Sequence, residues 1–279
     1  MKGLSSVVCV EDFWVRVPGG RIFVRRWTRG GEWGEDTKLP IILFHDSLGC
    51  VELWRNFPVL LCETTARDVI AYDRLGFGQS DAYEGPLDAN FIRDEASCFV
   101  KSIKSELQID QYVAVGHSVG GSMAAACASI EPADCAAVVT ISAQAYVEDK
   151  TLSGIKIAKC EFEKPGAFER LQKYHGDKAR WVLSAWVDTW LSEAFESWTI
   201  EAAAPELKCH VLAIHGELDE YGSVAHPQRI ANLSSKPGRY LIFPGCHHVP
   251  HRENPNLLVR VVHEFLDARN SSSSNIGFF

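Results

Sequence analysis

The sequence predicts an α/β protein built on a mainly parallel, doubly wound sheet. Short apolar runs alternate along the chain with stretches of helical periodicity, as expected of a sheet covered by helices on both faces. The runs show little polar alternation, which is typical of strands buried on both faces. They lie at residues 41–44, 69–72, 112–115, 136–141, 211–214 and 240–243.

Two further patterns lie N-terminal to the first of these strands. Residues 13–17 and 22–27 are β-prone and are joined by Pro18, Gly19 and Gly20, which predicts an N-terminal hairpin. The segment that follows, residues 29–40, is rich in glycine and charge and is expected to be a loop.

Helices are predicted between the strands and at the end of the chain. Apolar residues recur at helical spacing over residues 92–107. Near the C-terminus, Asn254 can cap a helix whose first residue is Pro255. This helix is expected to end near residue 268.

Residues 146–205 interrupt the alternation of strands and helices. They carry many aromatic residues at helical spacing and no convincing buried strand. We therefore expect a core of residues 1–145 and 206–268, a helical cap over the carboxyl edge of the sheet, and a disordered tail of residues 269–279.

Length and composition limit the classes of function. The chain has 279 residues, of which 46% are hydrophobic and 23% charged, as in globular enzymes. The net charge is −8 and no long basic run occurs, which argues against a nucleic-acid partner or an anionic membrane surface. No signal peptide or membrane-spanning run is recognised, so a cytoplasmic location is expected.

The cysteines suggest no covalent or metal framework. There are nine of them, an odd number, and no C-x-x-C pattern occurs. Neither a disulfide scaffold nor a zinc ribbon is expected, and most of the cysteines are interpreted as small core residues.

The strongest chemical signal is the sequence Gly-His-Ser-Val-Gly-Gly at residues 116–121. It matches G-x-S-x-G and stands between an apolar run and an alanine-rich, helix-prone run, the strand–turn–helix setting that this motif needs. A turn this tight strains Ser118 and projects its hydroxyl clear of the sheet. The backbone N–H of Val119 then faces the oxygen atom of the group that is attacked. Serine needs a base and an acid to become a good nucleophile.

Three histidines follow the last predicted strand, namely His247, His248 and His251. The pattern Gly-x-x-His-x-x-x-x-Glu-x-Pro favours His248 as the base, with His247 next. A polar loop cluster is the ordinary alternative. A zinc site made by the three histidines is a further one, but no matching cysteine or carboxylate set accompanies them.

The acid that orients the base is expected after the strand at residues 211–214. Asp219 is favoured because it lies farther along the loop than Glu217, while Glu217 and the neighbouring Glu220 are interpreted as solvated. The strand before the insertion is followed by Ser142, Ala143 and Gln144, with no carboxylate nearby.

A second oxyanion donor is expected on the loop after residues 41–44. The backbone N–H of Ser47 is the candidate, acting together with that of Val119. Loss of one such donor typically lowers the rate by about 10²–10³. His45, at the start of this loop, is interpreted as a structural anchor.

Taken together, these residues resemble the α/β-hydrolase superfamily, in which the triad follows the chain order found here, Ser118, Asp219, His248. Residues 72–81 match its D-x-x-G-x-G-x-S segment, and the resemblance covers residues 13–268. It implies the α/β-hydrolase fold and a serine hydrolase that needs no metal or cofactor. Aspartate is the nucleophile of the epoxide and haloalkane hydrolases of this superfamily, so Ser118 argues against both activities.

Within the superfamily, residues 142–147, 174–177 and 186–188 look like the biphenyl hydrolase-like (valacyclovir hydrolase) group. That group holds the amine of α-amino acid esters with an acidic residue just after the nucleophile. Val119 stands there in this chain, so a neutral or anionic acyl group is expected instead.

Two positions depart from the pattern of the superfamily. Asp46 and His247 each replace a glycine that is usual there. A carboxylate at residue 46 would disfavour anionic substrates if it points into the site.

The expected reaction is hydrolysis of a small or medium carboxylic ester, lactone or thioester with an apolar acyl part, by a monomer or a homodimer. The alternatives are hydrolysis of a carbon–carbon bond in a ring-cleavage product and a small-molecule receptor built on a hydrolase fold. The pocket is expected to be lined by His117, Trp181, Trp186 and Trp190, although the tryptophans could instead pack the cap against the core.

Overall fold

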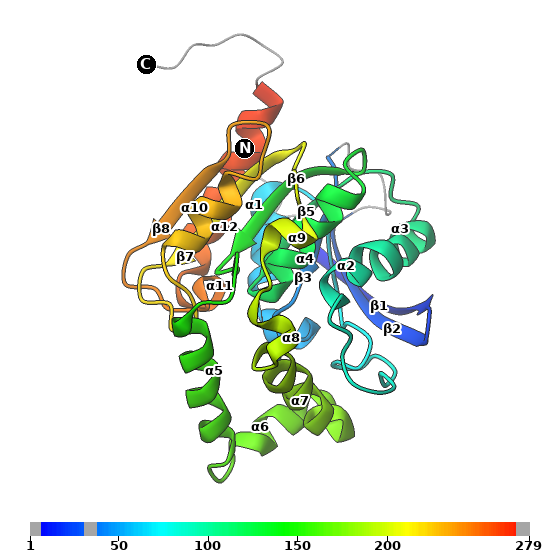
Figure 1. Ribbon diagram of the computed structural model, residues 1–279. Coiled ribbons are helices and arrows are strands. Elements are labelled where there is room, and N and C mark those ends of the chain that lie inside the picture. Colours follow the sequence, from blue (N-terminus) through cyan, green and yellow to red (C-terminus); the bar gives the residue numbers. More distant parts are fainter. Residues whose placement is uncertain (1–6, 31–37, 272–279) are drawn as a thin grey trace.

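The computed structural model describes residues 7–30 and 38–271 and has an eight-stranded sheet at its centre (Figure 1). The strand order is β1-β2-β4-β3-β5-β6-β7-β8. Strands β3 to β8 run parallel, whereas β2 is antiparallel to both β1 and β4. The predicted fold class is therefore confirmed. The strands are β1 (Val8–Val17), β2 (Gly20–Arg29), β3 (Ile41–Phe44), β4 (Val69–Tyr72), β5 (Tyr112–His117), β6 (Cys135–Ile141), β7 (His210–Gly216) and β8 (Arg239–Phe243).

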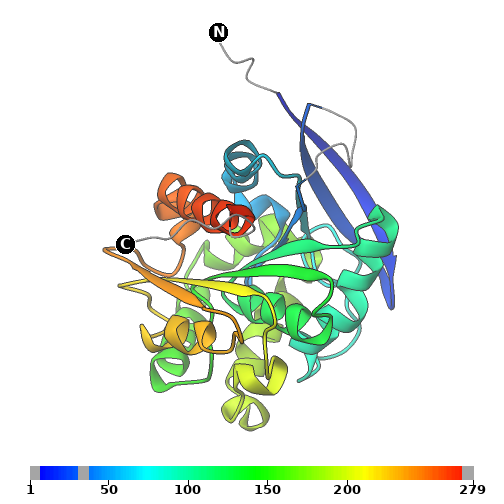
Figure 2. The ribbon, with the colours of Figure 1, turned by 90° about the horizontal axis from the view of Figure 1, so that it is seen from above.

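Helices cover both faces of this sheet (Figure 2). On one face α1 and α12 pack against the sheet through residues such as Leu61 and Val262, and on the other α3 and α4 do so through residues such as Ile103 and Met123. The helical elements are η1 (Val51–Trp54), α1 (Phe57–Thr65), α2 (Phe91–Asp94), η2 (Glu95–Phe99), α3 (Val100–Leu107), α4 (Val119–Ile130), α5 (Asp149–Phe162), α6 (Ala167–His175), η3 (Gly176–Lys178), α7 (Ala179–Trp190), α8 (Glu193–Glu196), α9 (Ile200–Ala203), α10 (Ala225–Ala231), α11 (Pro250–Glu253) and α12 (Pro255–Ser271).

The predicted strands are found with small changes of length. The bounds of β3 and β4 are those expected from the sequence, and the hairpin strands β1 and β2 are longer. The helix predicted over residues 92–107 comprises three successive elements, α2, η2 and α3, of which η2 is a π-helical turn. Such a turn accommodates an extra residue within an otherwise regular helix.

The segment between β6 and β7 is helical. Residues 146–205, all of which the structure describes, contain α5 to α9 and no extended strand. In Figure 1 helices α5, α6 and α7 project away from the sheet. The two ends of the segment meet, because Tyr146 and Thr199 form an antiparallel bridge and the N–H of Ile200 donates to the carbonyl of Ala145 at 2.7 Å.

Helix α12 begins at Pro255, as expected, and continues to Ser271. Residues 269–271, expected from the sequence to be part of a disordered tail, therefore belong to this helix. The rest of that tail, residues 272–279, lies outside the described residues, as do residues 31–37 of the expected loop. None of the described helices is both long and apolar enough to cross a bilayer.

The junction between β5 and α4 brings backbone atoms unusually close together. A Cβ atom at Gly120 would lie 2.1 Å from the carbonyl oxygen of Phe44 on β3, and one at Gly116 would lie 2.1 Å from the carbonyl oxygen of Gly120. Only glycine fits at either position. The start of α4 is therefore seated directly on the end of β3, which determines where the residue between them lies.

We predict that Gly120→Ala lowers stability by roughly 3 kcal/mol or more, since the added methyl overlaps backbone that cannot rotate away. This corresponds to a fall in Tm of roughly 6 °C or more. Gly166→Ala is the matched control, because a Cβ there meets only the end of the Arg170 side chain at 3.8 Å. The control should cost only about 1 kcal/mol of left-handed backbone strain. Thermal unfolding followed by circular dichroism measures both, and equal effects would contradict the steric argument.

Candidate active site

Ser118 occupies the sharp turn between β5 and α4. Its backbone has φ 55° and ψ −129°, a conformation that residues with a Cβ rarely adopt. The turn is held by the N–H of Ser118, which donates to the carbonyl of Ile141 at 2.8 Å. Backbone strain of about 1–3 kcal/mol persists only where the surroundings enforce it, and it is common at functional sites.

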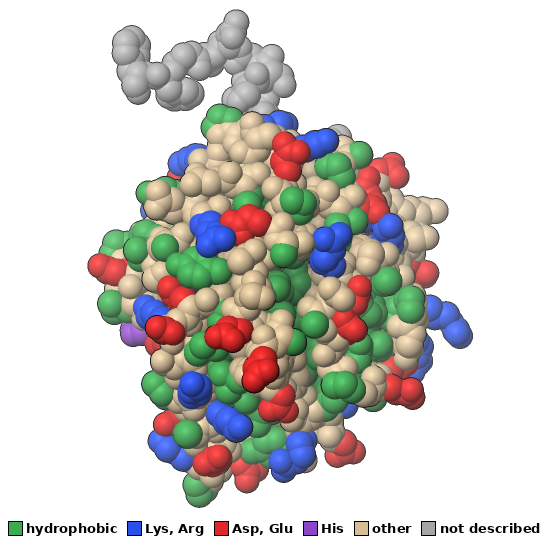
Figure 3. Space-filling model, in the orientation of Figure 1, with side chains coloured by type: hydrophobic (Ala, Val, Ile, Leu, Met, Phe, Trp, Pro, Cys, Tyr) green, Lys and Arg blue, Asp and Glu red, His purple; other side chains and the backbone are tan. Residues whose placement is uncertain are grey.

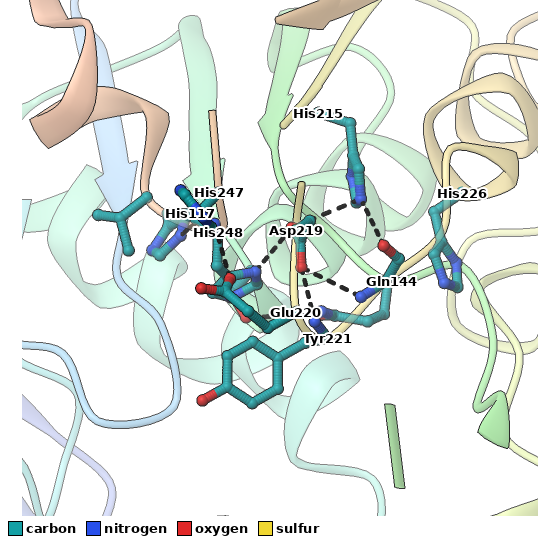
Figure 4. Close-up of polar contacts among 12 residues, drawn as sticks. His117, Gln144, His215, Asp219, Glu220, Tyr221, His226, His247 and His248 are labelled. Carbon is teal, nitrogen blue, oxygen red and sulfur yellow. Dashed lines mark hydrogen bonds and ion pairs between the residues drawn. The ribbon is translucent and has the colours of Figure 1, made fainter. Parts of the chain in front are cut away.

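His248 and Asp219 are hydrogen bonded to each other (Figure 4). Nδ1 of His248 lies 2.8 Å from Oδ2 of Asp219, which is almost completely buried. The other carboxylate oxygen of Asp219 accepts the N–H groups of Tyr221 at 2.8 Å and Gly222 at 3.1 Å. Burial alone would raise the pKa of Asp219, but the hydrogen bond from His248, and the charge of that ring when it is protonated, hold the pKa below its usual value. The aspartate is thus an ionised acceptor for the imidazole.

The two alternative acids are used elsewhere. Oε2 of Glu217 accepts the N–H of Gly245 at 2.9 Å, and Oε2 of Glu220 accepts the backbone N–H of His248 at 3.1 Å. Both therefore bind the backbone of the loop after β8, while Asp219 alone among the three acids contacts the His248 ring in the described structure.

A cavity of about 540 Å³ opens beside these residues. Ser118 and His248 both line it, whereas Asp219 lies behind the imidazole. The hydroxyl of Ser118 donates to Oε1 of Gln144 at 3.4 Å, a long hydrogen bond. Other residues that line the cavity are Asp46, Ser47, Leu48, Leu53, His117, Thr151, Ile155, Trp186, Trp190, Glu220, Tyr221, His247, Val249, Arg252 and Glu253.

The two residues expected to supply oxyanion donors lie at the two sides of the junction described above. Ser47 follows β3 and lines the cavity, and Val119 is the first residue of α4 and is fully buried. Because α4 begins against the end of β3, the loops that carry these two residues are neighbours.

Of the tryptophans expected in the pocket, Trp181 lies elsewhere. Trp186 and Trp190 line the cavity, but Trp181 stacks on Tyr83 at 5.2 Å between ring centroids and donates its Nε1–H to the carbonyl of Gly85 at 2.7 Å. Residues 186 and 190 are about 40° apart around the helix axis, whereas residue 181 is about 140° from residue 186. One face of α7 therefore meets the cavity, and Trp181 is on another.

His117 lines the cavity as the sequence predicts, and it has two polar partners that the sequence does not predict. Nδ1 of His117 lies 3.2 Å from Oδ2 of Asp46, and Nε2 lies 2.8 Å from the carbonyl oxygen of His248. The second oxygen of Asp46 accepts the N–H of Leu48 at 2.9 Å. Burial acts to raise the pKa of Asp46, yet the hydrogen bond with His117 and the positive charge of that ring keep the pKa below its usual value.

A second layer of buried histidines lies behind Asp219, and sequence reasoning missed it. His215, at the end of β7, has Nε2 at 3.4 Å from Oδ2 of Asp219 and 3.2 Å from the carbonyl oxygen of Gly222 (Figure 4). Burial lowers the pKa of His215 to about 4. Farther back, His226 accepts the N–H of Ala145 at 3.0 Å and its other nitrogen faces Glu148 at 3.0 Å.

The three histidines of the zinc alternative do not converge. His247 is half exposed and has Nδ1 at 3.2 Å from Glu253, whereas His251 is buried with its ring 4.8 Å from that of Trp54. Within residues 7–30 and 38–271, no group of three or more histidine, cysteine, aspartate or glutamate side chains is arranged to hold a metal ion.

Comparisons with known proteins agree with this architecture. A family profile described as alpha/beta hydrolase fold matches residues 40–160. The chain is 35% identical over 130 residues to the mouse (Mus musculus) protein named 1-acylglycerol-3-phosphate O-acyltransferase ABHD5, covering 45% of this chain and 34% of the mouse protein. It is 37% identical over 94 residues to 2-hydroxymuconate semialdehyde hydrolase of Pseudomonas sp. (strain CF600), covering 33% and 32%. The matches thus span about a third of the length of these curated relatives.

Solved structures resemble this chain over a larger share of its length than the curated relatives do. The proline iminopeptidase of Mycobacterium smegmatis superposes with a TM-score of 0.70 over 95% of this chain and all of that one, at 20% identity. At so low an identity the similarity concerns the fold, and it leaves the chemistry to be argued from the site itself.

We predict that His215 makes the protein less stable as the pH falls from 6.5 to 4. The unfolded histidine binds a proton near its ordinary pKa of 6.5, whereas the folded one does so only near 4, so protons favour the unfolded state within this window. The difference corresponds to roughly 3 kcal/mol at full effect.

His215→Gln should flatten this dependence, because the amide does not titrate. Urea unfolding at several pH values between 4 and 7 measures it, with half-exposed His247→Gln as the control. Identical slopes in wild type and His215→Gln would disprove the assignment.

Proposed function

Because the chain has the α/β-hydrolase fold, we propose that it is a serine hydrolase that cleaves a carboxylic ester, lactone or thioester. The observation that carries the proposal is the His248–Asp219 hydrogen bond beside the strained Ser118, at a cavity that Ser118 and His248 share. These are the parts that activate a serine hydroxyl, since a base must take its proton and an acid must orient that base.

In the proposed reaction Ser118 attacks the carbonyl carbon, and Nε2 of His248 takes the hydroxyl proton. Asp219 accepts the Nδ1–H of His248, which leaves Nε2 free to act as the base and stabilises the imidazolium that forms. The N–H groups of Ser47 and Val119 bind the oxyanion of the tetrahedral intermediate. His248 then passes the proton to the leaving group, and a water molecule deprotonated by His248 releases the acyl group from Ser118.

The resting position of Ser118 is compatible with this role. Its hydroxyl is engaged by Gln144 at 3.4 Å, a weak contact that a rotation about one side-chain bond breaks. In hydrolases without bound substrate such catalytic hydrogen bonds are often long and shorten only in the complex. Gln144, which follows β6, would then hold the hydroxyl between turnovers.

The walls of the cavity favour a neutral, apolar acyl group. Leu53, Ile155, Trp186 and Trp190 provide apolar surface. Apart from its histidines, the charged residues at the cavity are three acids, Asp46, Glu220 and Glu253, and one arginine, Arg252. That arginine donates two hydrogen bonds to the carbonyl of Leu53. An anionic substrate would meet a negative field there, so we narrow the expectation of a neutral or anionic acyl group to a neutral one.

The helical segment of residues 146–205 would act as the cap. Four of its residues line the cavity, namely Thr151 and Ile155 on α5 and Trp186 and Trp190 on α7.

The closer resemblance to the biphenyl hydrolase-like group stays a prediction, as do the cytoplasmic location and the monomeric or homodimeric state. On the face shown in Figure 3, acidic and basic side chains are interspersed, in keeping with a small-molecule partner rather than a nucleic acid.

Hydrolysis of a carbon–carbon bond is the second candidate. It is favoured by the similarity of 94 residues to 2-hydroxymuconate semialdehyde hydrolase. The same serine, histidine and aspartate would serve, but the substrate would have to ketonise first. Loss of the visible absorbance of a ring-fission product on addition of the protein would favour this candidate.

The first experiment is release of p-nitrophenol from a series of acyl esters, acetate to decanoate. Wild type is expected to turn over many times, with an optimum at one chain length, and Ser118→Ala is expected to lose at least about 10³-fold in kcat. A phosphonate that labels serine nucleophiles should modify wild type and not the variant. A single burst without turnover, or turnover that survives in Ser118→Ala, would contradict the proposal and favour a receptor or another nucleophile.

Trp186→Ala should move the optimum toward longer acyl chains, because removing the indole enlarges the cavity on its α7 side. Trp181→Ala is the matched control on the same helix, since its ring faces Tyr83 and not the cavity. Both variants are assayed with the p-nitrophenyl series well below their Tm. A shift that is equal in the two variants would show that loosening of the cap, and not cavity size, sets the preference.

A further inference from the structure

Both ring nitrogens of His117 face oxygen atoms. One faces the carboxylate of Asp46 at 3.2 Å and the other the carbonyl of His248 at 2.8 Å. A carboxylate and a carbonyl can only accept, so both contacts are hydrogen bonds only when each nitrogen carries a proton. His117 is 2% exposed, so its ring has little access to water as another partner. The geometry therefore indicates an imidazolium paired with Asp46.

This pair connects three loops at the carboxyl edge of the sheet. Asp46 lies on the loop after β3, and its second oxygen fixes the N–H of Leu48, one residue beyond Ser47. His117 ends β5, directly before Ser118. The carbonyl that His117 binds belongs to His248, on the loop after β8, and Figure 4 shows the two rings side by side.

Aromatic rings enclose the His117 side of the pair. His251 packs edge-on against His117 with ring centroids 4.6 Å apart, and Trp54 lies 6.4 Å away. Burial, together with the nearby charge of His117, lowers the pKa of His251 well below its ordinary value, so this second ring stays neutral. The other titratable ring facing His117 is that of His248 at 5.0 Å.

We propose that the Asp46–His117 ion pair sets the distance between the oxyanion loop and the base His248, and that His117 is thus a positioning residue of the reaction. The inference rests on the proposed serine hydrolase function. Ser47 and His248 act on opposite ends of one reacting group, so their separation must match the transition state. A misplacement of about 1 Å at such a site can lower the rate about 10²-fold.

Two variants of His117 distinguish the effect of its hydrogen bonds from the effect of its volume. In His117→Gln the side-chain amide has two N–H donors and can still donate to the Asp46 carboxylate and to the His248 carbonyl, whereas His117→Leu has no donor and fills a similar volume. We expect His117→Leu to lose about 100-fold in kcat with KM changed less than about threefold, and His117→Gln to recover to within about fivefold of wild type. A wild-type kcat in His117→Leu, or no recovery in His117→Gln, would overturn the proposal. Tm values of both variants show that they are folded at the assay temperature.

The charge state has a readout of its own. In full-length protein labelled with ¹⁵N-histidine, NMR should show two slowly exchanging ring N–H signals for His117 at neutral pH, assigned by their loss in His117→Gln. In Asp46→Asn only one of the two N–H signals should remain, because the neutral amide does not stabilise the positive charge of a doubly protonated ring. A single ring N–H signal in wild type would overturn the ion pair.

The phosphonate assay distinguishes this proposal from the function on which it rests. Phosphonylation of Ser118 also needs His248 as its base, but it needs no ester or lactone substrate. If wild type hydrolyses none of the esters, the proposed function fails, while slower labelling of His117→Leu than of His117→Gln would still support the positioning role. Equal labelling rates in wild type and both variants would refute that role.

Discussion

The site depends on a very close backbone contact between the start of α4 and the end of β3. Gly120 lies so near the Phe44 carbonyl that no side chain fits between them. This contact fixes the tight turn that strains Ser118, and it brings the loop with Ser47 beside the first N–H of α4. The other parts of the site, on loops after β6, β7 and β8, are arranged around this point.

Carboxylate and histidine pairs join those loops to one another. Asp219 pairs with His248, Asp46 contacts His117, and Glu148 contacts the buried His226. Each pair connects segments that are far apart in the sequence. Hydrogen bonds to charged groups are stronger than neutral ones, so a few such pairs can hold flexible loops in one arrangement. The carboxyl edge of the sheet is thus held by polar contacts, whereas apolar packing holds its two faces.

Sequence patterns were sufficient for the sheet and for the local motif around Ser118. Strands such as β3 and β4 are buried on both faces, so their apolar runs end where the strands end. Asp219 and His248 stand just after strands, where the parallel topology brings side chains to one edge. The contact between Asp46 and His117 spans 71 residues and depends on loop conformation, which no local pattern encodes. Helical spacing likewise groups the tryptophans of α7 by face, yet it does not say which face meets the cavity.

The two ends of the helical segment meet at one place, which affects how such a protein can change in evolution. The bridge between Tyr146 and Thr199 and the hydrogen bond from Ile200 to Ala145 bring the two ends of residues 146–205 together. The strands on either side, β6 and β7, are neighbours in the sheet and support each other without this segment. Helices can therefore be exchanged, lengthened or removed between these two anchor points while the strand ends keep their places. These anchor points thus join the helical segment, which lines part of the cavity, to the sheet that carries Ser118.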